Sequence, residues 1–350
     1  MDGDISLTNT RKLVNEYIQD VLKNRIAEAS NVNRTYEIFW RHINDVVVAG
    51  GKRIRPYLVM LGNGAIDVRV LPIAVAQELL HIAMLMHDDV IDKDFVRHGK
   101  KNISGIYRDT YGAYLNDETL ATHYGHGAGV LAGDVLISEA YYLVATSDFD
   151  DETKRKITHQ LRRSIFEIVG GELMDVEAGF MEGGTFDLLQ VYRYKTASYS
   201  FIGPLVSGAY CANLDQTMIE TFETYATHVG IAFQIQDDLL GVHGDQEETG
   251  KSRLTDLHEG KRTVLTANYE HTMNQQQRER FDAVFGSSTA SDIEIQALKD
   301  DMEASGAKEL TRRQAEHYFA LARGALDSLP EGVQKAGLVD FTSSLHNRRK

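Results

Sequence analysis

Three aspartates lie together at the end of an apolar stretch, where Asp88, Asp89 and Asp92 follow residues 80–87. A helix with 3.6 residues per turn places Asp88 and Asp92 one turn apart on the same face, with Asp89 beside them. Carboxylates this close repel one another, and apolar surroundings raise the cost of keeping them charged. Mg²⁺ would remove both penalties, because it prefers carboxylate oxygens shared with substrate phosphates. Taken alone, the pattern also fits a solvated acidic helix end.

A second acidic pair, Asp237 and Asp238, ends the apolar segment 230–236. Gln234, Asp237 and Asp238 are spaced i, i+3, i+4, so a helix places them on one face. Two such pairs about 150 residues apart, both on apolar helices, are difficult to explain as solvated faces. The alternative is a set of buried carboxylates that nearby lysines or arginines neutralise.

Basic residues accompany both acidic groups. Lys52 and Arg55 lie in a glycine-rich loop before an expected helix, where cations and backbone amides suit a diphosphate. Arg97 follows the first acidic group, and Lys251 and Lys261 flank the segment after the second. Singly, each fits a surface charge. Jointly, with Lys195, they describe a site for two diphosphates and a metal cluster.

The surrounding pattern predicts an all-α fold. Only four prolines occur, and each precedes a long stretch with helical apolar spacing, where proline is tolerated in the first turn. No strand alternation is evident. We expect residues 1–10 to be flexible and the polar, tyrosine-rich segment 99–125 to be a long, irregular surface excursion. Helices are expected at 10–30, 33–49, 56–66, 72–93, 126–147, 151–180, 186–200, 202–212, 216–242, 262–274, 291–304, 311–328 and 332–347.

Composition narrows the function classes. The net charge of −14 argues against a nucleic-acid partner, because phosphate backbones are held by basic surfaces. The one cysteine, Cys211, excludes an intrachain disulfide and fits a reducing compartment. No signal pattern or uninterrupted membrane-spanning apolar run is evident, so we expect a cytoplasmic protein with no membrane span. The acidic and basic residues run from 52 to 261, which predicts one domain over 1–350.

Six motifs follow one another along the chain in this order: GGKRIRP, HDDVID followed by RHG, AGDVL, YKTA, FQIQDDLLG and TGKSRLTDLHEGKRT. Over about residues 48 to 265 they resemble the trans-isoprenyl diphosphate synthase (polyprenyl synthetase) family. The resemblance implies a helical bundle around a deep central cavity, usually a homodimer. It also implies a Mg²⁺-dependent prenyltransferase that condenses isopentenyl diphosphate with an allylic diphosphate into an all-trans polyprenyl diphosphate.

Matched by position, the resemblance assigns a role to each candidate residue. It implies that the allylic diphosphate ionises and that the double bond of isopentenyl diphosphate attacks the resulting cation, with no nucleophilic side chain. The metal ligands would be Asp88, Asp89, Asp92, Asp237 and Asp238. The catalytic set would be Asp88, Asp92, Lys195, Thr196, Gln234 and Asp237, with Thr196 and Gln234 steadying the cation. Allylic-diphosphate contacts would be Arg97, Lys195, Gln234, Lys251 and Lys261, and isopentenyl diphosphate contacts would be Lys52, Arg55, His81 and His98.

Three positions depart from the family pattern. His98 stands where a second arginine is common, which implies weaker or pH-sensitive binding of isopentenyl diphosphate. Gly241 replaces the third acid of the second motif, a loss for which Asp245 could compensate, and Glu172 replaces a usual glutamine.

The residues before the first acidic motif indicate the product length, and three other classes of protein remain as alternatives. In the family that this chain resembles, bulky residues just before the first acidic motif limit chain growth. Here those positions hold Ala83 and Met84, and neither is aromatic, which favours geranylgeranyl diphosphate or a longer product. A terpene cyclase has no use for the isopentenyl diphosphate contacts. A non-catalytic subunit would be expected to lose its aspartates. A regulatory isoprenoid-binding protein would bind without turnover.

Overall fold

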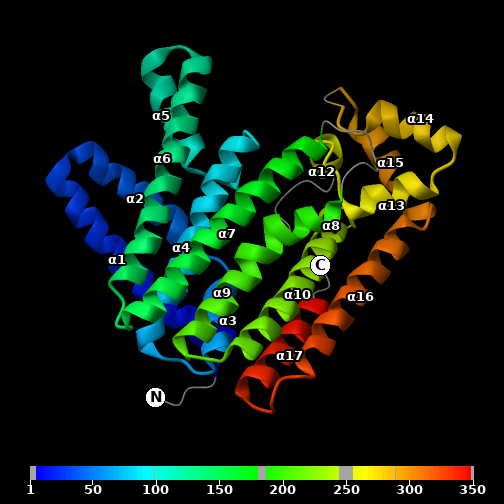
Figure 1. Ribbon diagram of the computed structural model, residues 1–350. Coiled ribbons are helices and arrows are strands. Elements are labelled where there is room, and N and C mark those ends of the chain that lie inside the picture. Colours follow the sequence, from blue (N-terminus) through cyan, green and yellow to red (C-terminus); the bar gives the residue numbers. More distant parts are fainter. Residues whose placement is uncertain (1–4, 98, 180–186, 244–254, 288, 348–350) are drawn as a thin grey trace. The chain divides into compact units, whose positions relative to one another are not determined.

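The computed structural model describes residues 5–97, 99–179, 187–243, 255–287 and 289–347, and these residues are largely helical (Figure 1). The predicted all-α class is therefore confirmed. The chain divides into two compact units, the first formed by 1–161 with 203–214 and the second by 162–202 with 215–350. The expectation of a single domain over 1–350 stays a prediction.

The first unit consists of helices that begin at polar caps. Ser6, Asn33, Asn102 and Asp117 each accept a hydrogen bond from a first-turn amide, which satisfies an otherwise unpaired donor. Its elements are α1 (Leu7–Val32), α2 (Arg34–Val48), α3 (Ile54–Asn63), the 3₁₀ turn η1 (Val68–Val70), α4 (Leu71–Ile91), β1 (Val96–Arg97), β2 (Lys100–Lys101), α5 (Ile103–Leu115), α6 (Glu118–Ala145), the first part of α7 (Asp151–Ala178) and α9 (Gly203–Cys211).

Helix α4 is the central element of the first unit. Most of its side chains are buried, and it packs against α6, α3 and α9. The contact between α3 and α9 is close, since a Cβ at Gly62 would lie 2.1 Å from the Leu205 carbonyl oxygen. Gln77 of α4 donates a 2.9 Å hydrogen bond to Ser207 of α9. These contacts fix the position of α4, and so they also fix the backbone of the aspartates at its end.

The second unit is organised around α10. This helix packs against α16 and against η2, a π-helix of eleven residues, and Tyr225 of α10 is fully buried. The elements are the rest of α7, α8 (Leu188–Val191), η2 (Tyr192–Ile202), α10 (Gln216–His243), α12 (Thr255–His258), α13 (Val264–Thr272), α14 (Gln275–Val284), α15 (Asp292–Ala304), α16 (Ala307–Leu326) and α17 (Val333–His346).

Residues 99–125 were expected to be an irregular surface excursion; the irregularity was wrong, because most of them are helical. Residues 103–115 form α5, and α6 already begins at Glu118, so the two helices make an antiparallel pair (Figure 1). Polar composition concealed this pairing, because the tyrosines pack in three dimensions: Tyr107 meets the Phe39 ring edge-on at 5.7 Å. Residues 1–10 were expected to be flexible. However, α1 begins at Leu7 with Thr10 buried, while residues 1–4 lie outside the described residues.

Other boundaries also differ from expectation. The sequence predicted no strand, yet Val96 and Arg97 pair with Lys101 and Lys100 in a short antiparallel hairpin. Helix α14 was missed, and the predicted helix 186–200 is instead α8 followed by the π-helix. A π-helix has no distinctive spacing of apolar residues, and such segments often occur at functional sites.

Two helices of the described residues are long and apolar enough to cross a membrane by length and composition alone. They are Val68–Ile91, whose apolar window is 72% buried within the protein, and Glu118–Ala145, whose window is 50% buried. Core helices of globular proteins pass the same test, so the expected lack of a membrane span stays a prediction.

Candidate active site

The first acidic group sits at the C-terminal end of α4. Asp89 is buried, Asp88 is half-buried, and Asp92 is the exposed residue that ends the helix. The β1–β2 hairpin returns the chain so that Arg97 donates to Asp89 at 2.8 Å and to Asp88 at 3.2 Å. Three carboxylates and one guanidinium leave this helix end strongly negative.

Asp89 differs from its neighbours in environment. Burial raises its pKa to about 6, although Arg97 and a hydrogen bond from Asn102 oppose that rise. Asp89 is therefore a buried carboxylate that is hydrogen-bonded by Arg97. Asp88 and Asp92, one turn apart, are more exposed to solvent. Their carboxylate oxygens are the hard donors that a divalent cation prefers, so this donor set fits Mg²⁺.

Helix α6 supports this cluster through glycines whose contacts the sequence analysis did not foresee. A Cβ at Gly133 would lie 2.1 Å from the Nε2 atom of His87, and one at Gly129 would lie 2.8 Å from Val90. His87, which immediately precedes Asp88, also approaches Asp134 at 3.5 Å. The signal was present in the spacing, because Gly125, Gly129 and Gly133 recur every fourth residue and so form a stripe without side chains on one helix face.

The glycine-rich loop carries Lys52 and Arg53, whereas Arg55, expected in the loop, lies in the first turn of α3. Arg53 is 3% exposed, has a positive φ of 52°, and donates to Glu78 at 2.8 Å and to the Val47 carbonyl at 2.8 Å. It therefore holds the loop in place. Lys52 is exposed, whereas Arg55 is half-buried.

His81 of α4, which the sequence analysis grouped with Lys52 and Arg55, lies where burial and the positive charge of Arg55 keep its pKa well below the usual range. At neutral pH it is therefore uncharged, and it can offer an N–H donor rather than a positive charge.

In the second unit, the two aspartates in the C-terminal part of α10 have opposite environments. Asp237 is exposed, whereas Asp238 is 4% exposed. Asp238 accepts hydrogen bonds from the Tyr192 hydroxyl and, at 2.9 Å, from the Gln234 amide nitrogen. Burial raises the pKa of Asp238 to about 7, and the positive charge of Lys261 opposes that rise. Gln234 also accepts a 2.7 Å hydrogen bond from the Thr196 hydroxyl.

Lys195, on the π-helix η2, is held by two carboxylates of α7. Its Nζ atom lies 2.6 Å from Asp175 and 3.0 Å from Glu172. The helices approach closely, because a Cβ at Gly171 would lie 2.3 Å from the Lys195 amide nitrogen. With Glu172 ionised, this trio has a net charge of −1, so a glutamate here offsets more of the lysine charge than a glutamine would.

The structure thus groups several predicted site residues within each unit. It brings Arg97 to Asp88 and Asp89 in the first, and Thr196, Gln234 and Asp238 together in the second. His98, Lys251 and Asp245 lie outside the described residues.

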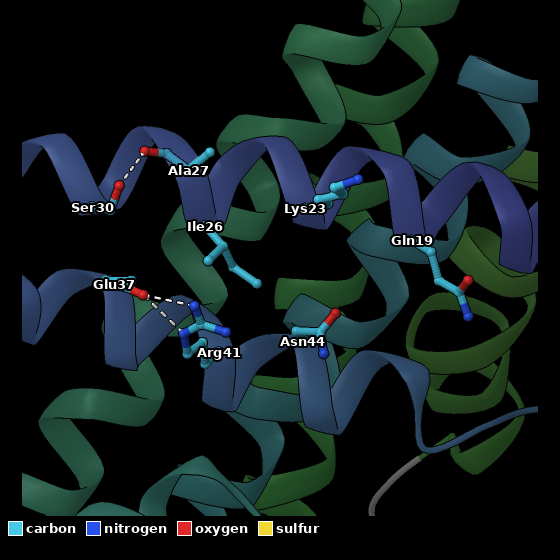
Figure 2. Close-up of a pocket in the computed structure, with 8 residues that line it drawn as sticks. All are labelled: Gln19, Lys23, Ile26, Ala27, Ser30, Glu37, Arg41 and Asn44. Atoms are coloured by element: carbon cyan, nitrogen blue, oxygen red, sulfur yellow. Dashed lines mark hydrogen bonds and ion pairs between the residues drawn. The ribbon is translucent and has the colours of Figure 1, made fainter.

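Two pockets of the first unit lie largely outside the motifs, and Val135 of AGDVL is the motif residue that lines one of them. One, of about 340 Å³, lies between α1 and α2 and is lined by Gln19, Lys23, Ile26, Ala27, Ser30, Glu37, Arg41 and Asn44 (Figure 2). Arg41 donates to Glu37 of the same helix, α2, at 2.7 Å. The other, of about 690 Å³, is a mainly apolar groove whose lining includes Tyr36, Tyr107, Tyr111 and Tyr124.

Comparison with known proteins gives a consistent result. Residues 37–302 match the model of a family described as polyprenyl synthetase. A short chain isoprenyl diphosphate synthase of Methanocaldococcus jannaschii is 32% identical over 264 residues, which are 74% of this chain and 75% of that protein. A geranylgeranyl pyrophosphate synthase of Geoglobus acetivorans is 29% identical over 342 residues, 96% of each chain.

Among solved structures, the geranylgeranyl pyrophosphate synthase of Corynebacterium glutamicum, complexed with isoprenyl diphosphate and magnesium, superposes with a TM-score of 0.91. It is 28% identical, and the match covers 98% of this chain and 100% of that one.

Proposed function

The chain belongs to the polyprenyl synthetase family, and we propose that it condenses isopentenyl diphosphate with an allylic diphosphate in a Mg²⁺-dependent reaction. It is a trans-prenyltransferase, as its relatives are. The observation that supports the proposed chemistry best is the acidic end of α4, where Asp88 and Asp92 project from a helix held rigidly by its packing. The product would be an all-trans polyprenyl diphosphate.

We propose Asp88 and Asp92, with Asp89 beside them, as metal ligands in the first unit and Asp237 in the second. When bound, Mg²⁺ would neutralise the diphosphate and so make it a better leaving group. Arg97, already bonded to Asp88, would add a fixed positive charge beside the departing diphosphate.

The remaining proposed contacts follow from charge and placement. The allylic diphosphate would be bound by Arg97, Lys195, Gln234, Lys251 and Lys261, and isopentenyl diphosphate by Lys52, Arg55, His81 and His98. His81 is a neutral donor in this set, because its pKa is well below the usual range. Thr196 and Gln234 would direct oxygen dipoles at the positive charge that develops on the allyl carbon.

We propose geranylgeranyl diphosphate or a somewhat longer chain as the product. Ala83 is fully buried one turn below His87, and Ala76 and Leu80 are buried further down α4. None of these positions carries an aromatic ring, so this face of α4 leaves more room than an aromatic residue would.

A homodimer is the proposed assembly. Four apolar side chains of α7 are exposed at helical spacing: Phe166 (69%), Val169 (51%), Leu173 (61%) and Val176 (38%). An exposed apolar stripe of this kind is typical of an association surface. Phe166→Glu combined with Leu173→Glu should convert the dimer into a monomer in sedimentation velocity, whereas an unchanged sedimentation coefficient would place the interface elsewhere.

The enzyme assay uses purified protein, Mg²⁺, isopentenyl diphosphate and, separately, dimethylallyl, geranyl and farnesyl diphosphate, with products identified by mass. Chain elongation supports the proposal. Hydrocarbon formed from the allylic substrate alone would indicate a cyclase, and absence of turnover would indicate a non-catalytic or regulatory protein.

A cytoplasmic location is proposed from the single cysteine and is tested by cell fractionation.

The metal assignment is tested by removing one carboxylate. Asp88→Ala should lower the turnover number by at least about two to three orders of magnitude while leaving the circular dichroism spectrum intact. Asp109→Ala is the matched control, because Asp109 is an exposed acid of the same unit that pairs with Lys101 and Arg108. Condensation by Asp88→Ala at the control rate would remove the metal role of Asp88.

A further inference from the structure

Tyr192, the first residue of the π-helix, lies outside every motif that the sequence analysis identified. Its side chain is buried, and its hydroxyl makes two hydrogen bonds. It accepts a 2.9 Å bond from the backbone N–H of Val264 and donates to the Oδ2 atom of Asp238. Val264 is the first residue of α13, where backbone N–H groups have no partner within the helix. That amide can only donate, so the hydroxyl must use its own proton toward Asp238.

Asp238 therefore receives donors on both of its oxygens. The Tyr192 hydroxyl occupies Oδ2, and the Gln234 amide nitrogen donates to Oδ1 at 2.9 Å. Two converging donors are the arrangement that an ionised carboxylate accepts. Because Asp238 is 4% exposed and both oxygens are already used, it has little capacity left for a cation. Asp237, its neighbour, is exposed.

The orientation of the Gln234 amide follows from this pairing. A carboxylate cannot donate, so it attracts the NH₂ side of the amide and turns the Oε1 atom away. That oxygen accepts a 2.7 Å hydrogen bond from the Thr196 hydroxyl. The proton of Thr196 thus points at Gln234, and its lone pairs are left for other partners. A reversed amide would present NH₂ to Thr196 and would turn the hydroxyl proton outward, which reverses the dipole.

We propose that Tyr192 and Asp238 are positioning residues that fix the direction of the Gln234 amide and the Thr196 hydroxyl, and that Asp238 does not bind the metal. The proposal replaces the sequence-based assignment of Asp238 as a ligand, and it rests on the proposed roles of Thr196 and Gln234. Tyr192 acts through Asp238, since its hydroxyl bonds the Asp238 carboxylate and the Val264 amide, and both residues are buried.

Asp238→Asn is the decisive variant, because asparagine has nearly the same shape but offers one acceptor and one donor. If its oxygen faces Tyr192, its NH₂ group faces Gln234 and forces that amide to reverse. Outer-shell residues that orient metal ligands typically contribute about 10–100-fold, and we expect a fall in turnover number of the same order for this orienting residue. The Mg²⁺ concentration for half-maximal activity should change less than about 2-fold. Asp237→Asn should instead raise that concentration at least about 10-fold.

Tyr192→Phe tests the same network from the other side. It removes one donor from Asp238, so the turnover number should fall by a smaller factor, again without a change in the Mg²⁺ requirement. Tyr225→Phe is the matched control, because Tyr225 is a fully buried tyrosine of the same unit whose hydroxyl bonds Thr342 at 2.9 Å. It should cost similar stability in thermal melts but leave the turnover number unchanged.

Distinct results would overturn the proposal. If Asp238→Asn raises the Mg²⁺ requirement as Asp237→Asn does, then Asp238 is a metal ligand. If Tyr192→Phe matches Tyr225→Phe in turnover number, then Tyr192 is merely structural. Should Asp238→Asn fail to fold, the comparison of the two tyrosine variants decides.

Failure of the proposed function would look different. A wild-type chain without turnover refutes the enzyme assignment itself. Full activity in Thr196→Val removes the proposed role of Thr196 and with it the reason for orienting Gln234, whereas the Mg²⁺ titrations still report whether Asp238 binds metal.

Discussion

Gly133→Ala should disturb the first acidic group by adding one methyl group to α6. The new Cβ would lie 2.1 Å from Nε2 and 2.4 Å from Cδ2 of His87, well inside any tolerated contact. In the present structure that ring donates a hydrogen bond of 3.2 Å to the Val130 carbonyl. His87 precedes Asp88 directly, so movement of the ring would be transmitted to a proposed metal ligand.

The magnitude follows from three opposing effects. Overpacking typically costs about 1–3 kcal/mol, and loss of a hydrogen bond costs about 0.5–1.5 kcal/mol. Replacing a helical glycine by alanine returns about 0.5–1 kcal/mol. The net expectation is a destabilisation of about 0.5–4 kcal/mol. Since displacements near 1 Å can cost about 100-fold in rate, we expect the turnover number to fall by about 10–100-fold.

Gly127→Ala is the internal control for this prediction. It lies on the same helix, yet a Cβ there would meet no atom within 4 Å. It should therefore raise stability slightly and leave activity unchanged. Both variants would be compared in urea denaturation and in the condensation assay. A double-mutant cycle with His87→Ala isolates the clash, because without the imidazole ring Gly133→Ala should cost little stability.

Equal behaviour of the two glycine variants would refute the predicted clash between Gly133→Ala and His87. A Gly133→Ala protein as stable and active as Gly127→Ala would mean that the ring yields without cost. Loss of stability that persists in the His87→Ala background would place the strain in the α6 backbone and not at the acidic group.

Three further predictions concern single side chains. Ala83→Phe or Ala83→Tyr should shorten the product, and an unaltered product distribution with activity retained would place the floor of the cavity elsewhere. His98→Arg should tighten isopentenyl diphosphate binding by about 1.5–3 kcal/mol, most visibly above neutral pH where histidine is uncharged, and an unchanged Michaelis constant across pH would contradict it. Burial raises the pKa of Cys211 to about 12, so at pH 8 only about one thiol in 10⁴ is ionised. Alkylation of Cys211 should therefore be slow, should accelerate about tenfold per pH unit and should become fast in urea. Rapid labelling of the native protein would instead show an accessible thiolate.

The sequence was informative wherever local spacing alone carries the meaning. An apolar run that ends in Asp88, Asp89 and Asp92 predicts a buried helix with acids at its end, and α4 confirms this because helical periodicity is a property of the chain itself. The same holds for α10 and its aspartates. The family also follows from the order of the motifs, which the match over residues 37–302 confirms.

The segment 99–125 shows where local patterns were insufficient. Its composition resembles a loop, yet α5 and α6 form because each covers the other and because Tyr107 packs on Phe39 and His42 of α2. Tertiary packing stabilises helices whose own residues favour them weakly. No spacing rule within the segment contains that information.

The distinction between Asp237 and Asp238 depended wholly on the tertiary structure. In the sequence they are adjacent identical residues, and helical geometry turns them about 100° apart without specifying which faces inward. Asp238 is the buried one because Tyr192, 46 residues away, donates a hydrogen bond to it. This bond offsets part of the free-energy cost of removing a carboxylate from water. A buried charge requires such partners, and they come together only when the π-helix, α10 and the start of α13 pack against one another.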